Sequence, residues 1–427
     1  MKKERREEQM NRRLMTGNEA AAWGARLSRA DYVPSFPITP QTEIIETIAR
    51  WTAAGEMEAR LVMMESEHSM VTAAGAAAAT GVRVFMATSS QGLLYATEML
   101  FSIPGWRVPL VLVNVSRGLS SPITLEPDHN DVLAMRDSGF LQIHAASCQE
   151  VLDAVLLACR LGEDPRVRLP VLVNMDGFYL SFTREAVEVP PPALAAAFVG
   201  EFHPTQPGGA AGSPSAQGVA VMGGATYSYF RYQVQLAHQS ALRVYDDVSR
   251  EFQQTFGRPM EAVEAYRMEG AQVAFLMIGS FSSKARGAVD ALREAGEPVG
   301  MIRPRLLRPY PARRLRELAR GVRALVVVDQ NLSPGLGGIL HGELAGALYN
   351  GGTDLPGAGR NPVLLSYIGG LGGRNITTEE FFAMAAEARE ALETGVVPPP
   401  RLLYTGAELE QVRRQQNMAL VKTAEAS

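Results

Sequence analysis

Residues 60–79 have the sequence RLVMMESEHSMVTAAGAAAA, in which a short apolar run leads through two acids into an alanine-rich stretch. The run predicts a strand, and Ser66 is a favoured N-cap for a helix that begins near Glu67. Glu65 and Glu67 are therefore expected at the carboxyl end of a strand. Ligands bind at that edge of an open α/β sheet, although acids in the first turn of a helix also suit its dipole without a ligand.

Length and composition bound the fold and exclude several classes of function. A chain of 427 residues predicts two or three domains, and 46% hydrophobic residues suffice for sizeable cores. A net charge of -4 gives no general reason to expect nucleic acid, and without an apolar run of about 18 residues we expect no membrane span. Cys148 and Cys159 match no disulfide framework or iron–sulfur spacing. This favours a reducing cytoplasm and a chain without a cluster of its own.

Short apolar runs alternate with helical patterns through the first half of the chain. Beyond the run at 60–64, we expect strands at residues 32–36, 82–88, 108–115 and 169–174, and helices at 42–51, 73–80 and 93–101. The runs at 108–115 and 169–174 are continuously apolar, as is typical of strands buried on both faces. Repeated strand–helix–strand units predict a parallel sheet with right-handed crossovers.

A change in composition separates this block from the second half. Residues 190–192 and 204–214 are rich in proline and glycine and predict a long surface connection, followed by a polar helix at 227–256. A second alternation then predicts strands at residues 273–278, 299–303 and 324–329, and helices at 283–295 and 312–319.

These shifts divide the chain into five expected parts. They are a charged N-terminal arm (1–14), a first α/β domain (15–190), a linker with a helical connection (191–261), a smaller α/β domain (262–395) and a C-terminal extension with a polar helix (396–427). We expect the arm, through Arg13, to be an exposed helix or a partner-binding segment, since no apolar core of a targeting signal follows it.

Common nucleotide, metal and hydrolase motifs are missing from the sequence. No Gly-x-Gly-x-x-Gly follows a strand, and no phosphate loop ends in Gly-Lys-Ser or Gly-Lys-Thr. The glycines at 335–338 lack the required register. The six histidines form no pair at ligand spacing, so we predict no metal ligand in this chain. Gly-x-Ser-x-Gly is also missing, which disfavours a serine hydrolase.

Five loops remain, each at the expected carboxyl end of a strand or in the loop beyond it. They are Pro37-Ile38-Thr39-Pro40, Glu65-Ser66-Glu67, Thr88-Ser89-Ser90-Gln91-Gly92, Asn114-Val115-Ser116-Arg117 and Asp128-His129-Asn130-Asp131. In this order they resemble the α subunit, or the corresponding pyrimidine-binding part, of the 2-oxoacid:ferredoxin oxidoreductases of the pyruvate:ferredoxin oxidoreductase type. Four segments of the second half resemble that family's transketolase-C-like domain: Gly279-Ser280, Arg308-Pro309-Tyr310-Pro311, 328–331 with 335–338, and 369–377. The resemblance covers residues 15–390.

The resemblance implies a fold and a role for each site residue. It implies a thiamine-diphosphate-binding domain of the pyrimidine type, built on a parallel sheet, followed by a transketolase-C-like α/β domain. Glu67 would be the acid that holds the aminopyrimidine while the ring tautomerises, with Glu65 as the alternative. Arg117 would pair with the 2-oxoacid carboxylate, which matches its planar fork. Thr39 would donate a hydroxyl near substrate and cofactor. Ser90 and Gln91 would line the same pocket.

Each assignment has a purely structural alternative. A helix-capping carboxylate would explain Glu67, a surface ion pair would explain Arg117, and a turn or N-cap residue would explain Thr39. Residues 128–131 are either part of the site or only loop architecture.

The resemblance also implies partner chains. Thiamine enzymes hold the diphosphate through a divalent metal on a Gly-Asp-Gly motif followed by asparagine, and this sequence has no such segment and no ferredoxin-type cysteine run. We therefore expect Mg²⁺ and the diphosphate on a β chain, with γ and δ chains carrying the remaining domain and the iron–sulfur clusters. The active site would lie at the α–β boundary. The implied reaction is oxidative decarboxylation of a 2-oxoacid to acyl-CoA and CO₂, with electrons passed through the clusters to ferredoxin or another acceptor.

The substrate is less well defined by the sequence. Pyruvate is the default, but Ser116-Arg117-Gly118 stands where pyruvate enzymes more often have Asn-Arg-Ala, and Leu180-Ser181-Phe182 lacks a histidine that more often follows the serine. An added aromatic could widen an apolar pocket, so an aryl 2-oxoacid such as phenylglyoxylate is the alternative. A non-catalytic structural subunit is the second alternative. A pure scaffold would need none of Glu67, Thr39 and Arg117.

Overall fold

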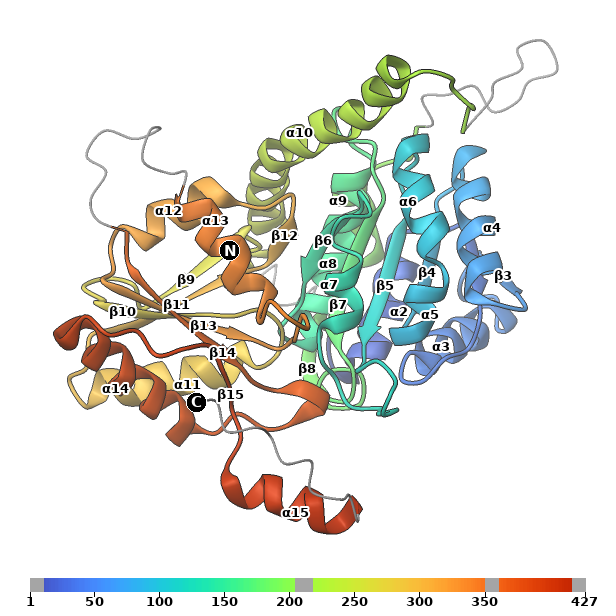
Figure 1. The fold of residues 1–427 in the computed structure, drawn as a ribbon. Coiled ribbons are helices and arrows are strands. Elements are labelled where there is room, and N and C mark those ends of the chain that lie inside the picture. The colour runs from blue at the N-terminus through green and yellow to red at the C-terminus, as the bar shows by residue number, and fades with distance from the viewer. Residues whose placement is uncertain (1–10, 204–217, 350–360, 417–427) are drawn as a thin grey trace, which may run out of the picture.

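The computed structural model describes residues 11–203, 218–349 and 361–416 and contains two α/β units side by side (Figure 1). The first unit has a five-stranded sheet in the order β12-β6-β7-β5-β4. Its parallel strands are β4 (Phe85–Thr88), β5 (Val111–Ser116), β6 (Leu141–His144) and β7 (Val171–Asp176). Beside it, β2 (Tyr32–Ser35) and β3 (Arg60–Met63) form a parallel pair, which a bridge from Tyr32 to Val84 joins to the edge. The parallel sheet predicted for the first half is confirmed.

Helices cover both faces of this sheet because its central strands are apolar on both sides. On β5, Val111, Val113 and Val115 face one core, and Leu112 faces the other. The first core contains α2 (Gly17–Leu27), α3 (Thr42–Ala53), α8 (Cys148–Gly162) and α9 (Pro192–Val199). The second contains α4 (Glu67–Ala79), α5 (Ser90–Tyr95), α6 (Thr97–Trp106) and α7 (Asn130–Ala134).

The second unit is a six-stranded sheet in the order β15-β14-β13-β10-β11-β9. Its strands are β9 (Val263–Tyr266), β10 (Val273–Leu276), β11 (Val299–Pro304), β13 (Ala324–Asp329), β14 (Val363–Ile368) and β15 (Arg401–Leu402). All neighbours are parallel except β9, which runs antiparallel to β11. In Figure 1, α11 (Ser282–Glu294) and α14 (Thr378–Thr394) lie below the sheet, and α12 (Ala312–Ala319) and α13 (Ile339–Tyr349) lie above it. The second alternation predicted from the sequence is confirmed.

Two ends of the chain differ from the expectation. We expected an exposed helix or a partner-binding segment through Arg13, but residues 11–13 belong to β1 (Asn11–Thr16), which pairs antiparallel with β8 (Arg184–Val189). Residues 11–14 are exposed and Met15 and Thr16 are buried, and Thr16 then caps α2 in a capping box with Glu19. Residues 1–10 lie outside the described part. From the expected C-terminal extension, β15 joins the second sheet, and α15 (Gly406–Gln416) is the polar helix.

The expected linker region is only partly described. Residues 204–217 of the predicted surface connection lie outside the described part of the chain. The long helix α10 (Gly224–Phe256) corresponds to the polar helix predicted at 227–256. Its second half packs on the first core through residues such as Ala241, Val248 and Phe252.

The two units share a strand pairing and an apolar core. The short strand β12 (Leu306–Arg308) belongs by sequence to the second unit but pairs antiparallel with β6 of the first. The core beneath α4 and α6 continues under α12 and α13 through Leu276, Leu325 and Val327. The units are therefore packed together rather than joined only by a linker.

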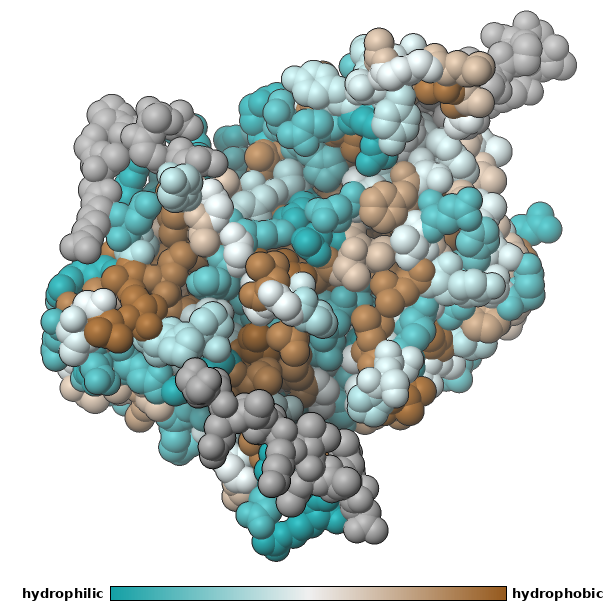
Figure 2. Space-filling model, in the orientation of Figure 1, coloured by the Kyte–Doolittle hydropathy of each residue, from teal (hydrophilic) through white to brown (hydrophobic). Residues whose placement is uncertain are grey.

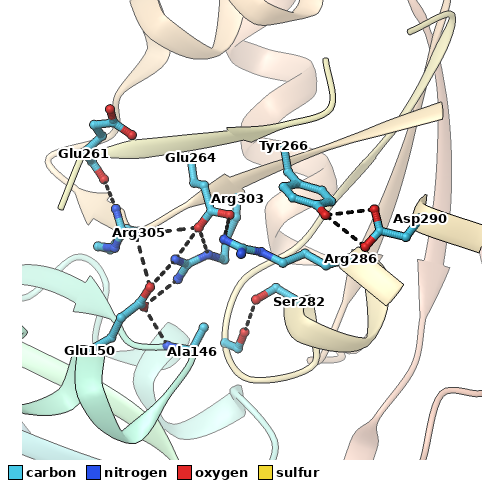
Figure 3. Close-up of polar contacts among 11 residues, drawn as sticks. Ala146, Glu150, Glu261, Glu264, Tyr266, Ser282, Arg286, Asp290, Arg303 and Arg305 are labelled. Carbon is cyan, nitrogen blue, oxygen red and sulfur yellow. Dashed lines mark hydrogen bonds and ion pairs between the residues drawn. The ribbon is translucent and has the colours of Figure 1, made fainter. Parts of the chain in front are cut away.

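A buried ion network also links the units (Figure 3). Arg303 on β11 is 1% exposed. Its Nη1 and Nη2 donate hydrogen bonds to the Glu150 carboxylate on α8, at 2.9 and 2.6 Å. Its Nε donates to Glu264 on β9 at 2.9 Å, and Arg305 adds a bond to Glu150 at 3.1 Å. Although burial alone would raise the pKa of Glu150, the two guanidinium groups lower it to about 2.

This network predicts an acid-dependent loss of stability. The unfolded pKa of Glu150 is 4.5, so its contribution is complete above that pH and is lost as the pH falls toward 2. We expect Glu150→Gln to lower the free energy of unfolding by about 3 kcal/mol at pH 7, because the buried Arg303 and Arg305 then share Glu264 as their one remaining carboxylate in the network. The difference from the wild type should shrink between pH 5 and pH 2 in urea unfolding curves. Glu317→Gln, which removes an exposed i,i+4 pair with Arg313, is the control and should change stability by less than about 1 kcal/mol. An equal effect of both substitutions would contradict the prediction.

Candidate active site

The two acids of the opening stretch lie at the end of β3, but only one is buried. Ser66 caps α4, and its hydroxyl accepts a hydrogen bond from the Ser69 amide at 3.2 Å. Glu67 is 6% exposed in the first turn of the helix. Glu65 is exposed, and a hydrogen bond from the Ser69 hydroxyl lowers its pKa. Of the two acids, Glu67 is therefore the one whose carboxylate is sheltered from water.

A glycine allows the Thr88–Gly92 loop to lie directly on the Glu67 carboxylate. A Cβ at position 92 would overlap Glu67 Oε1 and would stand 2.7 Å from the Thr88 hydroxyl. The loop and the acid therefore share one wall of the site. Any larger residue at position 92 would push the Glu67 carboxylate from its place.

Arg117 joins three of the predicted segments. Its Nη1 donates to the Thr39 carbonyl oxygen at 2.6 Å, and its Nη2 donates to Gln91 Oε1 at 2.5 Å. Burial lowers the pKa of Arg117, and the nearby charges of Asp131 and Glu67 oppose that shift. The structure thus brings Thr39, Gln91, Arg117 and Glu67 to one edge of the sheet. The surface ion pair considered for Arg117 does not describe this buried guanidinium.

Thr39 takes part through its backbone. Its carbonyl oxygen holds Arg117, while the residue itself is exposed at the turn before α3. The next residue, Pro40, is anchored by Asn18, whose Nδ2 donates to the Pro40 carbonyl oxygen at 2.8 Å. A role for the Thr39 hydroxyl toward a ligand stays a prediction.

Ser90 lies buried in a conformation that serine rarely adopts. Its φ of 49° is in the left-handed region, which costs a non-glycine residue about 1 kcal/mol. Its hydroxyl donates to the Gly118 carbonyl oxygen at 3.0 Å and lies 2.7 Å from Gln91 Oε1. Ser90 therefore orients two neighbours in the site: the Gln91 side chain and the turn that contains Arg117 and Gly118.

Asp131 is the residue whose importance the sequence did not reveal. Its buried carboxylate accepts five hydrogen bonds between 2.6 and 3.3 Å. The donors are the amides of Ser90, Arg117 and Val132, the Asn114 side chain and the Ser116 hydroxyl. We expected residues 128–131 to be either part of the site or only loop architecture. Asp131 supports the site through its hydrogen bonds to the Ser90 and Arg117 amides. The sequence signal for Asp131 was weak: it is a carboxylate in the first turn of a short helix that follows two polar strand ends.

A second buried pair ties this edge to the second unit. His129 Nε2 lies 2.7 Å from Asp176 Oδ1, and Asp176 accepts from the Ser280 amide and hydroxyl at 2.7 and 2.6 Å. Burial alone would lower the pKa of His129, but the Asp176 carboxylate raises it above the usual value. Gly279 is required here because a Cβ would stand 2.8 Å from both Asp176 and His129. The Gly279-Ser280 turn identified in the sequence is thus a domain contact.

Several buried polar atoms at this edge have no hydrogen-bond partner among the described residues. They are Thr88 Oγ1, Ser89 Oγ, Gln91 Nε2 and Arg117 Nε. Buried donors and acceptors are normally satisfied, so these atoms indicate a site for a polar ligand. In the described part of the chain, no group of three or more His, Cys, Asp or Glu side chains could hold a metal ion. A cavity of about 1070 Å³ lies elsewhere, around Trp23 and Arg83, and includes none of the predicted site residues.

Apolar side chains on β3, α5, α6 and the loop after Gly118 face solvent. Met63 at the end of β3, Tyr95 at the end of α5, Phe101 on α6, and Ile123 and Leu125 in the loop after Gly118 are all exposed. Figure 2 shows apolar patches on this face of the molecule, over the region of α5 and α6 and between the two units.

Fold and site together define the class of protein. The first unit presents a buried carboxylate at the edge of a parallel sheet, and a smaller α/β unit follows it. Residues 24–250 match the family model described as pyruvate flavodoxin/ferredoxin oxidoreductase, thiamine diphosphate-binding, and residues 271–381 match pyruvate:ferredoxin oxidoreductase core domain II. The chain belongs to the 2-oxoacid:ferredoxin oxidoreductase family and is of its α-subunit type.

Relatives cover nearly the whole chain. It is 38% identical to pyruvate synthase subunit PorA of Pyrococcus abyssi over 389 residues, which are 91% of this chain and 96% of that protein. It is 39% identical to ketoisovalerate oxidoreductase subunit VorA of Pyrococcus horikoshii over 385 residues, 90% of this chain and 95% of that protein.

One solved structure supports the fold alone. The 2-oxoglutarate:ferredoxin oxidoreductase of Magnetococcus marinus superposes with a TM-score of 0.68 at 20% identity, over 88% of this chain and 65% of that chain. None of the described helices combines the length and the apolar character that crossing a membrane requires.

The Asp131 contacts predict that this residue controls the site without touching a ligand. Asp131→Asn would place an amide NH₂ among five donors, so we expect Ser90 and Arg117 to shift and kcat/KM of the assembled enzyme to fall ten- to a hundredfold, with a rise in KM for the 2-oxoacid. Asp128→Asn is the matched control, since Asp128 accepts from the Asn130 amide and contacts neither Ser90 nor Arg117 through its side chain. Steady-state kinetics with an artificial electron acceptor measure both. Unchanged KM and kcat in Asp131→Asn would show that the network is only structural.

Proposed function

We propose that this chain holds the aminopyrimidine end of thiamine diphosphate and the carboxylate of a 2-oxoacid in a multi-subunit 2-oxoacid:acceptor oxidoreductase. The observation that carries the proposal is the buried Glu67 carboxylate beside the buried Arg117 guanidinium at one sheet edge. The reaction is oxidative decarboxylation of the 2-oxoacid, with coenzyme A as co-substrate, to acyl-CoA and CO₂. The two electrons released pass to iron–sulfur clusters in partner subunits.

The residues fit the cofactor in this role. When bound, thiamine diphosphate supplies a nucleophilic carbon and an electron sink for the loss of CO₂. Glu67 can share a proton with a ring nitrogen, and Gly92 keeps the carboxylate in its place because a Cβ at that position would overlap Oε1. The free hydrogen-bonding atoms of Thr88 and Gln91 can satisfy the polar edge of that ring.

Arg117 suits the substrate carboxylate for a similar reason. Its two terminal nitrogens are already directed by Thr39 and Gln91, and its Nε remains free within the described part of the chain. A guanidinium held in this way keeps its charge in a fixed place, so the side chain loses little conformational entropy when an anion binds. Ser90 and Asp131 keep that geometry, so the chain's own share of catalysis is positioning and charge neutralisation.

The site is completed by other chains in this proposal. A β-type subunit would hold the diphosphate and Mg²⁺, and γ- and δ-type subunits would carry the remaining domain and the clusters. The subunit names of the relatives support an interface at this edge, as do the exposed Met63, Tyr95, Ile123 and Leu125 on the elements that carry the site. Ferredoxin or another acceptor would take electrons through these partners. Two free, buried cysteines are compatible with a reducing cytoplasm.

A small aliphatic 2-oxoacid, pyruvate first, is the proposed substrate. The relatives named for pyruvate and ketoisovalerate are similarly close, and the comparisons do not favour the aryl-acid or non-catalytic alternatives. Both sequence departures have local explanations. A Cβ at Gly118 would press on Thr124 and Asp128, and Phe182 packs edge-to-face against Phe178 with the ring centroids 5.1 Å apart. Phe182 also lines a cavity with α3 residues, not with Glu67 or Arg117. The proposed reason for an aryl pocket therefore loses its support.

Substitution of the two acids tests the cofactor assignment. We expect Glu67→Gln to lower kcat of the assembled enzyme by about a hundredfold or more, because the amide cannot exchange a proton with the ring. Glu65→Gln is the control and should stay within about twofold of the wild type, since Glu65 is exposed and only accepts from Ser69. Both are measured by reduction of an electron acceptor at saturating thiamine diphosphate. The opposite ranking would assign the role to Glu65, and two active variants would refute the proposal.

A substrate panel tests the second part. We expect the complex to reduce the acceptor with pyruvate or 2-oxoisovalerate, and at least tenfold more slowly, by kcat/KM, with 2-oxoglutarate and phenylglyoxylate. Arg117→Lys should raise KM for the preferred acid about tenfold, because lysine keeps the charge but loses the fork. A preference for phenylglyoxylate would restore the aryl alternative. Inactivity with every acid, in a complex that has bound its cofactor, would favour a structural subunit.

A further inference from the structure

The first half of α10 is the feature that the active site does not use. None of residues 224–233 is buried, and the first buried residue of the helix is Val234. The helix then packs on the first unit, where Gly139 lies against Val234 and accepts a hydrogen bond from His238 at 3.0 Å. In Figure 1 the first turns of α10 project at the top of the molecule, beyond the sheets.

The exposed side of α10 carries a regular stripe of large side chains. Tyr229, Tyr232 and Leu236 are spaced i, i+3 and i+7 and are 60%, 56% and 37% exposed. The stripe continues at seven-residue spacing through Arg243, which is also exposed. At 3.6 residues per turn it lies about 130° around the helix from the buried residues Val234, Ala237 and Ala241. Large side chains at i, i+3 and i+7 form a pattern by which one helix packs along another, with a charged residue at its end.

The stripe is complementary to itself. Tyr229 and Arg243 are each seven residues from Leu236, and Tyr232 and Ser240 are each four residues from it. If two copies of α10 pack antiparallel about a two-fold axis at Leu236, Arg243 of each copy faces Tyr229 of the other. The guanidinium then meets an aromatic face and the Tyr232 hydroxyl meets the Ser240 hydroxyl. A two-fold contact requires this reciprocity.

We propose that this face of α10 docks against the same face of a second copy of this chain, antiparallel and centred on Leu236. The parallel arrangement would set Arg243 against Arg243, and like charges in contact are unfavourable. In the antiparallel arrangement, each copy covers Arg243 of the other copy with the aromatic ring of Tyr229. Arg243 is available, since among the described residues its side chain makes one hydrogen bond, to the Ser240 hydroxyl, which is long at 3.4 Å. The proposal is independent of the chemistry assigned to Glu67.

Single cysteines test this arrangement in the full chain, purified with its co-expressed partner subunits. Leu236→Cys lies on the proposed axis and should form a disulfide between two copies, giving a band of twice the chain mass on a non-reducing gel. The native thiols do not interfere, because Cys148 and Cys159 are buried. Gln235→Cys is the control: it is exposed but lies about 100° around the helix, so it should not cross-link.

A mixed pair fixes the direction. Tyr229→Cys and Arg243→Cys should cross-link only when the two variants are co-expressed, because each residue lies about 21 Å from its own copy across the axis and disulfide formation needs Cα atoms within about 7 Å. Leu236→Glu should convert the two-fold assembly to half its mass in sedimentation, with unchanged circular dichroism. Cross-linking of Leu236→Cys to a different subunit would overturn the proposal, as would absence of any cross-link or a cross-link in Tyr229→Cys alone.

Discussion

The buried carboxylate of Asp131 is the interaction on which the candidate site depends. A carboxylate has room for about four to five donors, and this one is filled by groups from the ends of β5, the start of α5 and its own helix. Burial raises the pKa of Asp131, so the donors must offset the loss of water. Because Ser90 is held in a strained conformation and Arg117 begins a turn, both need such a fixed point. The geometry of the candidate site therefore depends on one buried residue that binds Ser90 and Arg117 through their backbone amides.

The same logic operates between the two units. The Glu150–Arg303 network and the His129–Asp176–Ser280 contact each place opposite charges or dipoles in a dry interface, where a lost partner is costly. The apolar core that continues from the first unit into the second supplies most of the cohesion, and the polar contacts select one orientation. His129 follows Asp128 and precedes the helix of Asp131, so the orientation of the second unit and the geometry of Arg117 are mechanically connected.

The parts of the fold that could be predicted from the sequence are those governed by local pattern. The apolar runs at 108–115 and 324–329, and the helix at 312–319, agree with β5, β13 and α12 because periodicity and length decide them. The sequence did not predict β1, β6, β8, β9, β12, β14 or β15, since strand pairing depends on partners distant in sequence. The grouping of Glu67, Arg117, Ser90 and Gln91 followed from their order at strand ends. Asp131 and Asp176 did not, because a residue that supports a site through buried hydrogen bonds has no sequence pattern of its own.

The unsatisfied atoms at the edge explain why the site needs a ligand and a partner. Each buried donor or acceptor without a partner costs about 1–3 kcal/mol, and Thr88, Ser89, Gln91 and Arg117 each contribute one among the described residues. A fold that keeps this cost recovers it when a polar ring and a carboxylate occupy the site. The apolar side chains of Ile123 and Leu125 add a second cost, exposure to water, which only a covering surface removes. Cofactor binding and subunit association would then be coupled. Cofactor binding would satisfy the buried polar atoms, and subunit association would cover the exposed apolar side chains of the same unit.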